Sequence, residues 1–204
     1  MQPKKALFEK HKCTSHQDQL IKNAKEEMIR KTLDLGCGLR PKNPFQMDQV
    51  FGVDISENAS LNIKGADLAV EPIPFENNYF DCVSAFDFIE HIPRIIYMPS
   101  RRFCFVELMN EIYRVLKPGG LFFSFTPAYP APAAFRDPTH VNIITDETFP
   151  MYFDDKNRIA TIYGFNGYFR IEKQEWHENN LHLKTTMRKL ITKPQSNNSS
   201  SISD

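Results

Sequence analysis

Two glycines flank a cysteine directly after a short apolar run, in the segment TLDLGCG at residues 32–38. Glycine weakens a strand interior, so Gly36 and Gly38 indicate a strand end whose backbone meets another group closely. Asp54 ends a second apolar run, 20 residues beyond Asp34. That spacing suits an acid that accepts hydrogen bonds from both hydroxyls of a ribose. The pattern therefore predicts a nucleoside-containing ligand at one edge of a sheet.

The same segment lacks the third glycine of the dinucleotide-binding pattern G-x-G-x-x-G. Pro41 stands in its place, and together with Arg40 and Pro44 it disfavours a helix that starts at once. A helix N-terminus that would bind a pyrophosphate is therefore poorly supported. An NAD-dependent oxidoreductase is the less favoured alternative.

Five apolar runs of strand length could position these residues. They alternate with connecting segments, and several end at Gly, Asp or Pro, which predicts a mostly parallel sheet with covered faces. Ligands of such sheets bind at the carboxyl ends of the strands, which is where Gly36, Gly38 and Asp54 fall. The runs occupy residues 32–35, 50–55, 61–68, 80–86 and 121–125.

One strong helix is predicted over residues 102–116, where apolar side chains repeat at intervals of 4, 3 and 4. KPGG at 117–120 ends it. Only about a dozen residues separate the first two strands, which leaves room for a rudimentary helix there. Near the C-terminus, residues 167–177 and 181–190 predict an antiparallel pair joined by a turn at 178–180.

The whole sequence predicts one domain over residues 1–194, opened by an amphipathic helical segment within 1–31 and followed by a disordered Ser- and Asn-rich tail at 195–204. Lys and Arg together number 25, as do Asp and Glu, so no nucleic-acid partner is predicted. Without a run of about 20 apolar residues, no membrane span is predicted either. Four scattered cysteines and no signal-like N-terminus favour a reduced, cytoplasmic protein.

Four segments, in this order, resemble the motifs of class I S-adenosylmethionine-dependent methyltransferases: LDLGCG, GVDI, ADLAVEPIPFENNYFDCVSAFDFIEHI and RVLKPGGLFFSFTP. The resemblance covers roughly residues 32–127. RPKNPF, FVELMNEIYRVLKPGG and PAAFRDPTHVNIIT are similar to a narrower, type-11-like group of small bacterial methyltransferases. The family implies a Rossmann-like α/β fold with a seven-stranded, mostly parallel twisted sheet flanked by helices and an antiparallel strand near the C-terminus. It also implies S-adenosylmethionine as the cofactor.

The resemblance implies how the first two strand ends would bind that cofactor. The loop of Asp34, Gly36, Cys37 and Gly38 would lie under the methionine moiety. Asp54 would accept hydrogen bonds from the ribose hydroxyls. Arg40, in a loop that departs from the family pattern, could pair with the methionine carboxylate.

The resemblance also implies the walls around the adenine and the sulfonium. Asp67 would accept a hydrogen bond from the adenine amino group, while Ile55 and Leu68 would pack on the ring. Ala85 and Phe86, at the end of the fourth strand, would border the sulfonium. An aromatic ring such as that of Phe86 could attract this cation by about 0.5–2 kcal/mol.

The segment TPAYPAPAAFRDPTHVNIIT at 126–145 follows the fifth strand and would emerge on the same sheet edge. Its four prolines restrain the backbone, which favours a shaped substrate lid over residues 126–158. Tyr129 and Phe135 are its predicted aromatic walls for the substrate. A shaped lid suits methyl transfer, because the in-line displacement depends largely on alignment.

A hydroxyl or ammonium acceptor must also lose a proton. His140 is the predicted base because its intrinsic pKa lies near neutrality, with Asp137 to orient it and His91 as a second candidate. A carboxylate or thiolate acceptor would need no base, and the histidines would then only position it. Asp137 could also serve simply as a turn residue, and Glu90 could be structural or functional.

The predicted function is transfer of a methyl group from S-adenosylmethionine to an oxygen or nitrogen atom of a small-molecule or saccharide acceptor. A non-catalytic cofactor-binding module remains a second alternative. Cys37 is predicted to be a small apolar filler rather than a nucleophile. The pattern H-x-C-x-x-H at 11–16 lacks a nearby fourth ligand, so no metal site is predicted.

Overall fold

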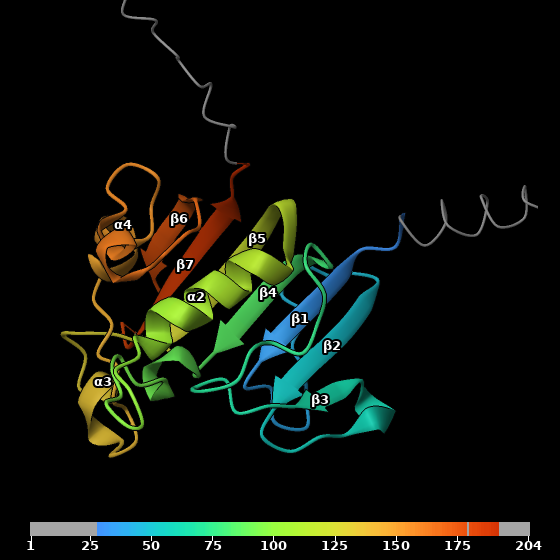
Figure 1. Ribbon diagram of the computed structural model, residues 1–204, viewed down its shortest axis with the longest axis horizontal. Coiled ribbons are helices and arrows are strands. Elements are labelled where there is room, and N and C mark those ends of the chain that lie inside the picture. Colours follow the sequence, from blue (N-terminus) through green and yellow to red (C-terminus); the bar gives the residue numbers. More distant parts are fainter. Residues whose placement is uncertain (1–27, 179, 192–204) are drawn as a thin grey trace, which may run out of the picture.

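The computed structural model describes residues 28–178 and 180–191. Its seven strands form one sheet in the spatial order β3-β2-β1-β4-β5-β7-β6 (Figure 1). The strands are β1 (Lys31–Leu35), β2 (Gln49–Asp54), β3 (Ile63–Gly65), β4 (Phe80–Phe86), β5 (Leu116–Pro127), β6 (Phe169–Trp176) and β7 (His182–Lys189). The helices are α2 (Cys104–Val115), α3 (Ala133–Arg136) and α4 (Thr148–Tyr152), with 3-10 turns η1 (Ala59–Leu61), η2 (Ile89–His91) and η3 (Ile159–Tyr163).

Strands β1 to β5 pair in parallel, and β7 joins β5 and β6 in antiparallel fashion. The predicted sheet is confirmed, including its antiparallel C-terminal pair. From β1 the chain moves outward through β2 to β3 and then returns to β4 on the other side of β1. This reversal of strand order lies between β1 and β4, which is where open α/β sheets bind ligands.

The connection between β1 and β2, and the strand β3 that follows β2, contain less regular structure than the sequence predicts. Residues 36–48, between β1 and β2, form turns and no helix, so the rudimentary helix expected in this short crossover is wrong. Pro41 and Pro44 within it disfavour helical backbone. Strand β3 is shorter than the predicted run over 61–68, because Ala59–Leu61 form the turn η1 and Asn62 has a left-handed φ of 55°. The chain then leaves the sheet after Gly65 towards the site.

Helix α2 covers one face of the sheet (Figure 1). Met109 and Ile112 are fully buried on its inner side together with Leu33 and Val83 of the sheet, which confirms the predicted apolar face. The chain passes from Val115 straight into β5, so the KPGG segment opens a strand.

The opposite face of the sheet is partly covered by the loop between β1 and β2. The ring of Phe45 in this loop meets that of Phe123 edge-on, with 6.1 Å between centroids. The thiol of Cys37 lies against the sheet at Gly52, where an added Cβ would be only 2.4 Å from its sulfur. A short connection thus replaces a covering helix.

Residues 126–158, the predicted lid, contain α3 and α4 and are tied to η2. The backbone N–H groups of Val141 and Asn142 both donate to the carbonyl oxygen of Glu90, each at 2.9 Å. The Asn142 side chain adds a bond to the carbonyl of Ile89 at 3.0 Å. These bonds hold the middle of the lid against the segment that follows β4.

The predicted leading helix over 16–30 lies almost wholly outside the described residues. The same is true of the H-x-C-x-x-H pattern and of the Ser- and Asn-rich tail. Among the residues that the structure describes, none of the helices has the length and apolar character needed to cross a bilayer.

Candidate active site

The glycine loop bends sharply at the end of β1. Gly36 and Gly38 have left-handed φ angles of 62° and 56°, a region that side chains disfavour. The N–H of Gly36 donates to the carbonyl of Val53 at 2.9 Å. The end of β1 is therefore fixed to the end of β2, and both strand ends face one site.

Asp34 anchors this loop from below. Its carboxylate accepts hydrogen bonds from the backbone N–H of Lys42 at 2.8 Å and from the hydroxyl of Ser84 at 2.7 Å. Burial raises the pKa of Asp34 to about 6 in spite of these bonds. Asp34 is 1% exposed, so its direct partners are the loop and β4.

Asp54 closes the site from the second strand. Its Oδ2 accepts a hydrogen bond of 2.8 Å from the N–H of Gly38. Beyond it opens a cavity of about 300 Å³, on whose wall the structure brings together five residues predicted from the sequence. These are Gly36, Asp54, Ile55, Asp67 and Leu68.

The other five predicted cofactor residues do not line that cavity: Asp34 and Gly38, described above, and Cys37, Ala85 and Phe86. Cys37 packs on the sheet, and burial raises its pKa to about 11, which leaves a neutral thiol. Ala85 is buried in the core. Phe86 holds the ammonium of Lys42 over its ring, 4.2 Å from the centroid. The roles of Ala85 and Phe86 beside a sulfonium remain predictions.

Asp87 and Phe88 line the cavity instead, and sequence reasoning missed both. Asp87 has a left-handed φ of 48°, which turns the chain out of β4. The Phe88 ring then lies against Gly36, where an added Cβ would be 2.2 Å from Cδ2. The segment Phe86-Asp87-Phe88 offered two aromatic candidates, and only the turn at Asp87 decides which one faces the cavity.

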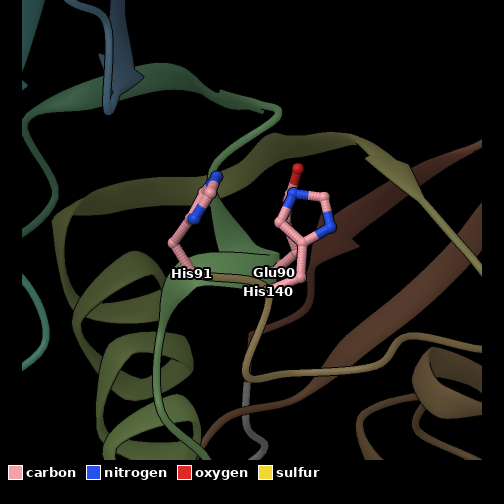
Figure 2. A group of neighbouring side chains, drawn as sticks. All are labelled: Glu90, His91 and His140. Carbon is pink, nitrogen blue, oxygen red and sulfur yellow. The ribbon is translucent and has the colours of Figure 1, made fainter. Parts of the chain in front are cut away.

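His91 and His140 meet beside this cavity, although 49 positions separate them in the chain. Their ring centroids are 4.9 Å apart in an edge-to-face arrangement. Figure 2 shows the two rings side by side, with the carboxyl of Glu90 next to the His140 ring. His91 itself is on the cavity wall. The two predicted bases therefore form one group with a buried acid.

Asp137 is linked by hydrogen bonds to His91, through Thr139. The Thr139 hydroxyl donates to Asp137 Oδ1 at 2.7 Å and contacts His91 Nδ1 at 3.0 Å. Because that hydroxyl donates its single proton to Asp137, His91 Nδ1 is assigned as the donor to it, and in the neutral ring Nε2 then carries the lone pair. The predicted partner, His140, has its Nε2 4.0 Å from Asp137 Oδ2, beyond hydrogen-bond distance.

Glu90 is the third member of the group and is 1% exposed. Its Oε2 accepts a hydrogen bond of 2.8 Å from the hydroxyl of Thr126. Burial raises the pKa of Glu90 to about 7, an effect that Asp87 reinforces and His140 opposes. The sequence alone did not decide whether Glu90 is structural or functional. Its burial depends on contacts with residues 126–158, which are distant in the sequence.

The predicted substrate walls lie farther out on the lid. Tyr129 and Phe135 are 54% and 55% exposed, and their rings meet edge-on with centroids 6.3 Å apart. They are thus available to a substrate that enters from solvent. Their substrate contacts remain a prediction.

The methyltransferase-domain family matches residues 33–124. The match runs from within the first strand, through the glycine loop and the residues that line the cavity, into β5. The chain carries a class I S-adenosylmethionine-dependent methyltransferase domain. S-adenosylmethionine is the cosubstrate of this domain.

Curated relatives of the methyltransferase domain include two plant proteins. The 24-methylenesterol C-methyltransferase 2 of Arabidopsis thaliana is 27% identical over 146 residues, which are 63% of this chain and 38% of that protein. The 24-methylenesterol C-methyltransferase 3 of the same plant is 29% identical over 127 residues, or 54% and 33%. The chain therefore matches only about a third of the length of these relatives.

Solved structures agree in fold. A SAM-dependent methyltransferase from Archaeoglobus fulgidus superposes with a TM-score of 0.51 at 16% identity, covering 84% of this chain and 91% of that one. The [4+2]-cyclase SpnF gives 0.53 at 15% identity, covering 86% and 81%. SpnF is named for a different reaction, a [4+2] cyclisation. The arrangement of strands alone therefore does not define the chemistry.

Proposed function

We propose that the chain transfers a methyl group from S-adenosylmethionine to an oxygen or nitrogen atom of a small-molecule or saccharide acceptor. The supporting observation is that a single cavity is lined by Gly36, Asp54 and Asp67 and also by His91. A nucleoside-binding wall and a proton acceptor thus face the same space. The balanced charge of the chain gives no reason to prefer a nucleic acid, and a cytoplasmic setting stays part of the proposal.

The cavity wall supports a definite order for the parts of the cofactor. Asp54 would hold the ribose, and Asp67 would accept the adenine amino group while Leu68 lies under the ring. The glycine loop would carry the methionine part. The sulfonium would then come near Phe88, whose ring can attract a cation by about 0.5–2 kcal/mol.

Methyl transfer requires the acceptor lone pair, the methyl carbon and the sulfur to lie in line. The carbon–sulfur bonding pair leaves with the sulfur, and S-adenosylhomocysteine is released. A hydroxyl or ammonium acceptor loses its proton to the group formed by His91, His140 and Glu90. Thr139 and Asp137 keep His91 in the tautomer whose Nε2 can accept it.

A carbon acceptor is the second candidate, because both plant relatives are C-methyltransferases by name. An alkene carbon attacks the methyl group through its π electrons and leaves a carbocation. The adjacent carbon must then lose a proton. The same buried group could take that proton after the transfer rather than before it.

The test separates cofactor binding from turnover. Calorimetry of the full chain with S-adenosylhomocysteine, and with NAD as the control, is expected to show binding of the first alone. Labelled S-adenosylmethionine incubated with a metabolite extract and with sterol extracts is then expected to yield a labelled product. Tight cofactor binding without labelled product in any extract would favour a non-catalytic module, and NAD binding in place of S-adenosylhomocysteine would favour the oxidoreductase.

A further inference from the structure

Two buried polar atoms of the His91 group have no hydrogen-bond partner. They are Oε1 of Glu90 and Nδ1 of His140. The Glu90 side chain is almost fully buried and that of His140 is 9% exposed, so water does not readily satisfy them. A buried acceptor without a partner costs about 1–3 kcal/mol, which means that something absent from the chain itself is expected to complete this group.

The chemistry of the two atoms indicates a cation. The Glu90 carboxyl in its ionised form can only accept, and an imidazole nitrogen either accepts or, when protonated, donates. No hydrogen bond joins the two side chains, although their potential ligand atoms lie within 4.8 Å of one another. A metal ion placed among them would satisfy both at once.

His91 supplies a third donor. Its Nδ1 bonds to Thr139, so its Nε2 retains a lone pair. In proteins, a histidine that binds a metal usually has its other ring nitrogen fixed by such an outer partner. Within residues 28–178 and 180–191, Glu90, His91 and His140 form the group whose ligand atoms come this close (Figure 2).

We propose that Glu90, His91 and His140 bind a divalent transition-metal ion, with Zn²⁺ as the best fit. Two imidazoles and one carboxylate are a common ligand set for zinc, and a fourth position stays open to water or to a substrate oxygen. Zinc–ligand bonds of about 2.0–2.2 Å place tetrahedral ligand atoms roughly 3.3–3.5 Å apart. The group therefore has to contract by roughly 1.5 Å at most, a change that side-chain rotations can supply.

The site has a consequence for catalysis that rests on the proposed function. A hydroxyl acceptor at the open position would bind the ion through oxygen and release its proton to water, because the ion lowers the pKa of the hydroxyl. Its oxygen lone pair would then form the bond to the methyl carbon as the carbon–sulfur bond breaks. In this arrangement His91 and His140 act as ligands, and water accepts the proton in place of a histidine base.

The experiment measures the metal directly on the full chain. Purified protein is stripped with a chelator, dialysed against Zn²⁺ and analysed for bound metal, and Co²⁺ is titrated as a spectroscopic probe of tetrahedral coordination. One ion per chain is expected. His140→Ala and Glu90→Gln are each expected to weaken binding at least 100-fold. Thr139→Val, which keeps the shape of the residue but breaks the bond to His91, is expected to weaken it 10- to 100-fold.

Two control variants test whether metal binds at other positions in the chain. Cys13→Ser disables the H-x-C-x-x-H pattern at 11–16, and His177→Gln removes another histidine outside the group. Both are expected to keep the ion. Unchanged binding in His140→Ala and Glu90→Gln, or no ion in the wild-type protein, would overturn the proposal and leave these residues as proton acceptors.

S-adenosylhomocysteine binding is measured on the same samples. Cofactor binding without zinc would overturn the metal site and leave the proposed function intact. Zinc binding without cofactor binding would support the metal site and contradict the proposed function. The two proposals therefore fail in different ways.

Discussion

Polar and charged groups at the two edges of the sheet differ in how completely they are hydrogen-bonded. At the amino edge, Lys189 donates hydrogen bonds of 2.8, 2.7 and 2.6 Å to Asn78 Oδ1 and to the carbonyls of Tyr113 and Leu116. Lys117 pairs with Asp81 at 2.9 Å on the same edge. At the carboxyl edge, Glu90 and His140 each keep a buried atom without a partner.

We interpret this difference as a division of roles: the charged groups at the amino edge stabilise the fold, and those at the carboxyl edge bind other molecules. The Lys189 ammonium satisfies carbonyls at the end of α2, as cations at helix C-termini do. Its burial lowers its pKa to about 8, but every bond it makes is to the chain itself. The carboxyl edge instead leaves hydrogen-bonding and ligand capacity available for molecules that are not part of the fold. Four substitutions test this contrast, from the largest expected effect to the smallest.

Gly36→Ala is expected to cost about 2–4 kcal/mol of stability. Its φ of 62° is unfavourable for alanine, and the new Cβ would overlap the Phe88 ring. Gly38→Ala is the matched control, with a φ of 56° but no atom within 4 Å of the added Cβ. It is expected to cost only about 1 kcal/mol. Thermal unfolding of both variants checks this, and equal losses would show that the approach of Phe88 is unimportant.

Asp34→Asn is expected to change how stability depends on pH. The folded pKa of Asp34 is about 6 and the ordinary value is 3.8, so between these values the unfolded chain gives up a proton that the folded chain retains. Wild-type stability relative to the variant should therefore fall as the pH rises from 4 to 6, by up to about 3 kcal/mol. Denaturant unfolding of both proteins at pH 4, 5, 6 and 7 measures the difference. A constant difference would contradict the burial effect.

Asp54→Ala is expected to weaken S-adenosylhomocysteine binding by about 1.5–3 kcal/mol, the range for hydrogen bonds to a charged group. The control is Asp48→Ala, which removes an exposed acid beside the opposite end of β2, where Asp48 pairs with Arg30. Calorimetry should show unchanged affinity for that control. Equal affinities in the two variants would mean that Asp54 does not contact the ribose.

Lys189→Met is expected to lower stability by about 1–2 kcal/mol, because carbonyls at the end of α2 lose their donor while the burial cost of the ammonium also disappears. Cofactor affinity should stay at the wild-type value, since Lys189 is at the far edge of the sheet. Thermal unfolding and calorimetry on one preparation test both parts. A loss of affinity without a loss of stability would reverse the proposed division between the edges.

The sheet could be predicted from the sequence because strand formation leaves a local signal. Apolar runs bounded by turn residues identified the five parallel strands, the turn at 178–180 identified the antiparallel pair, and the glycine pair with Asp54 identified the edge that carries the cavity. The prediction for β3 was too long, because Ala66 and Leu68 continue the apolar pattern after the chain has left the sheet. Burial pattern alone does not distinguish a strand from the buried loop that follows it.

The inner part of the site could not be predicted, because it depends on contacts between distant segments. Glu90 and His140 meet only because backbone bonds hold the lid on η2. The expected pairing of Asp137 with His140 overlooked Thr139, whose hydroxyl instead connects Asp137 to His91. Phe86 was predicted and Phe88 was missed, because a left-handed turn at Asp87 has no clear signature in a single sequence.

The lid is attached to Glu90 and therefore has two parts. The inner part has a fixed position, whereas the residue types of the outer part are free to vary. Val141 and Asn142 fix the inner part next to His140, whereas Tyr129 and Phe135 project from the outer part into solvent. Divergent copies of this chain could therefore exchange the outer aromatic residues and accept a differently shaped molecule without rebuilding the reactive centre. Selectivity and reactivity would then evolve as separate traits.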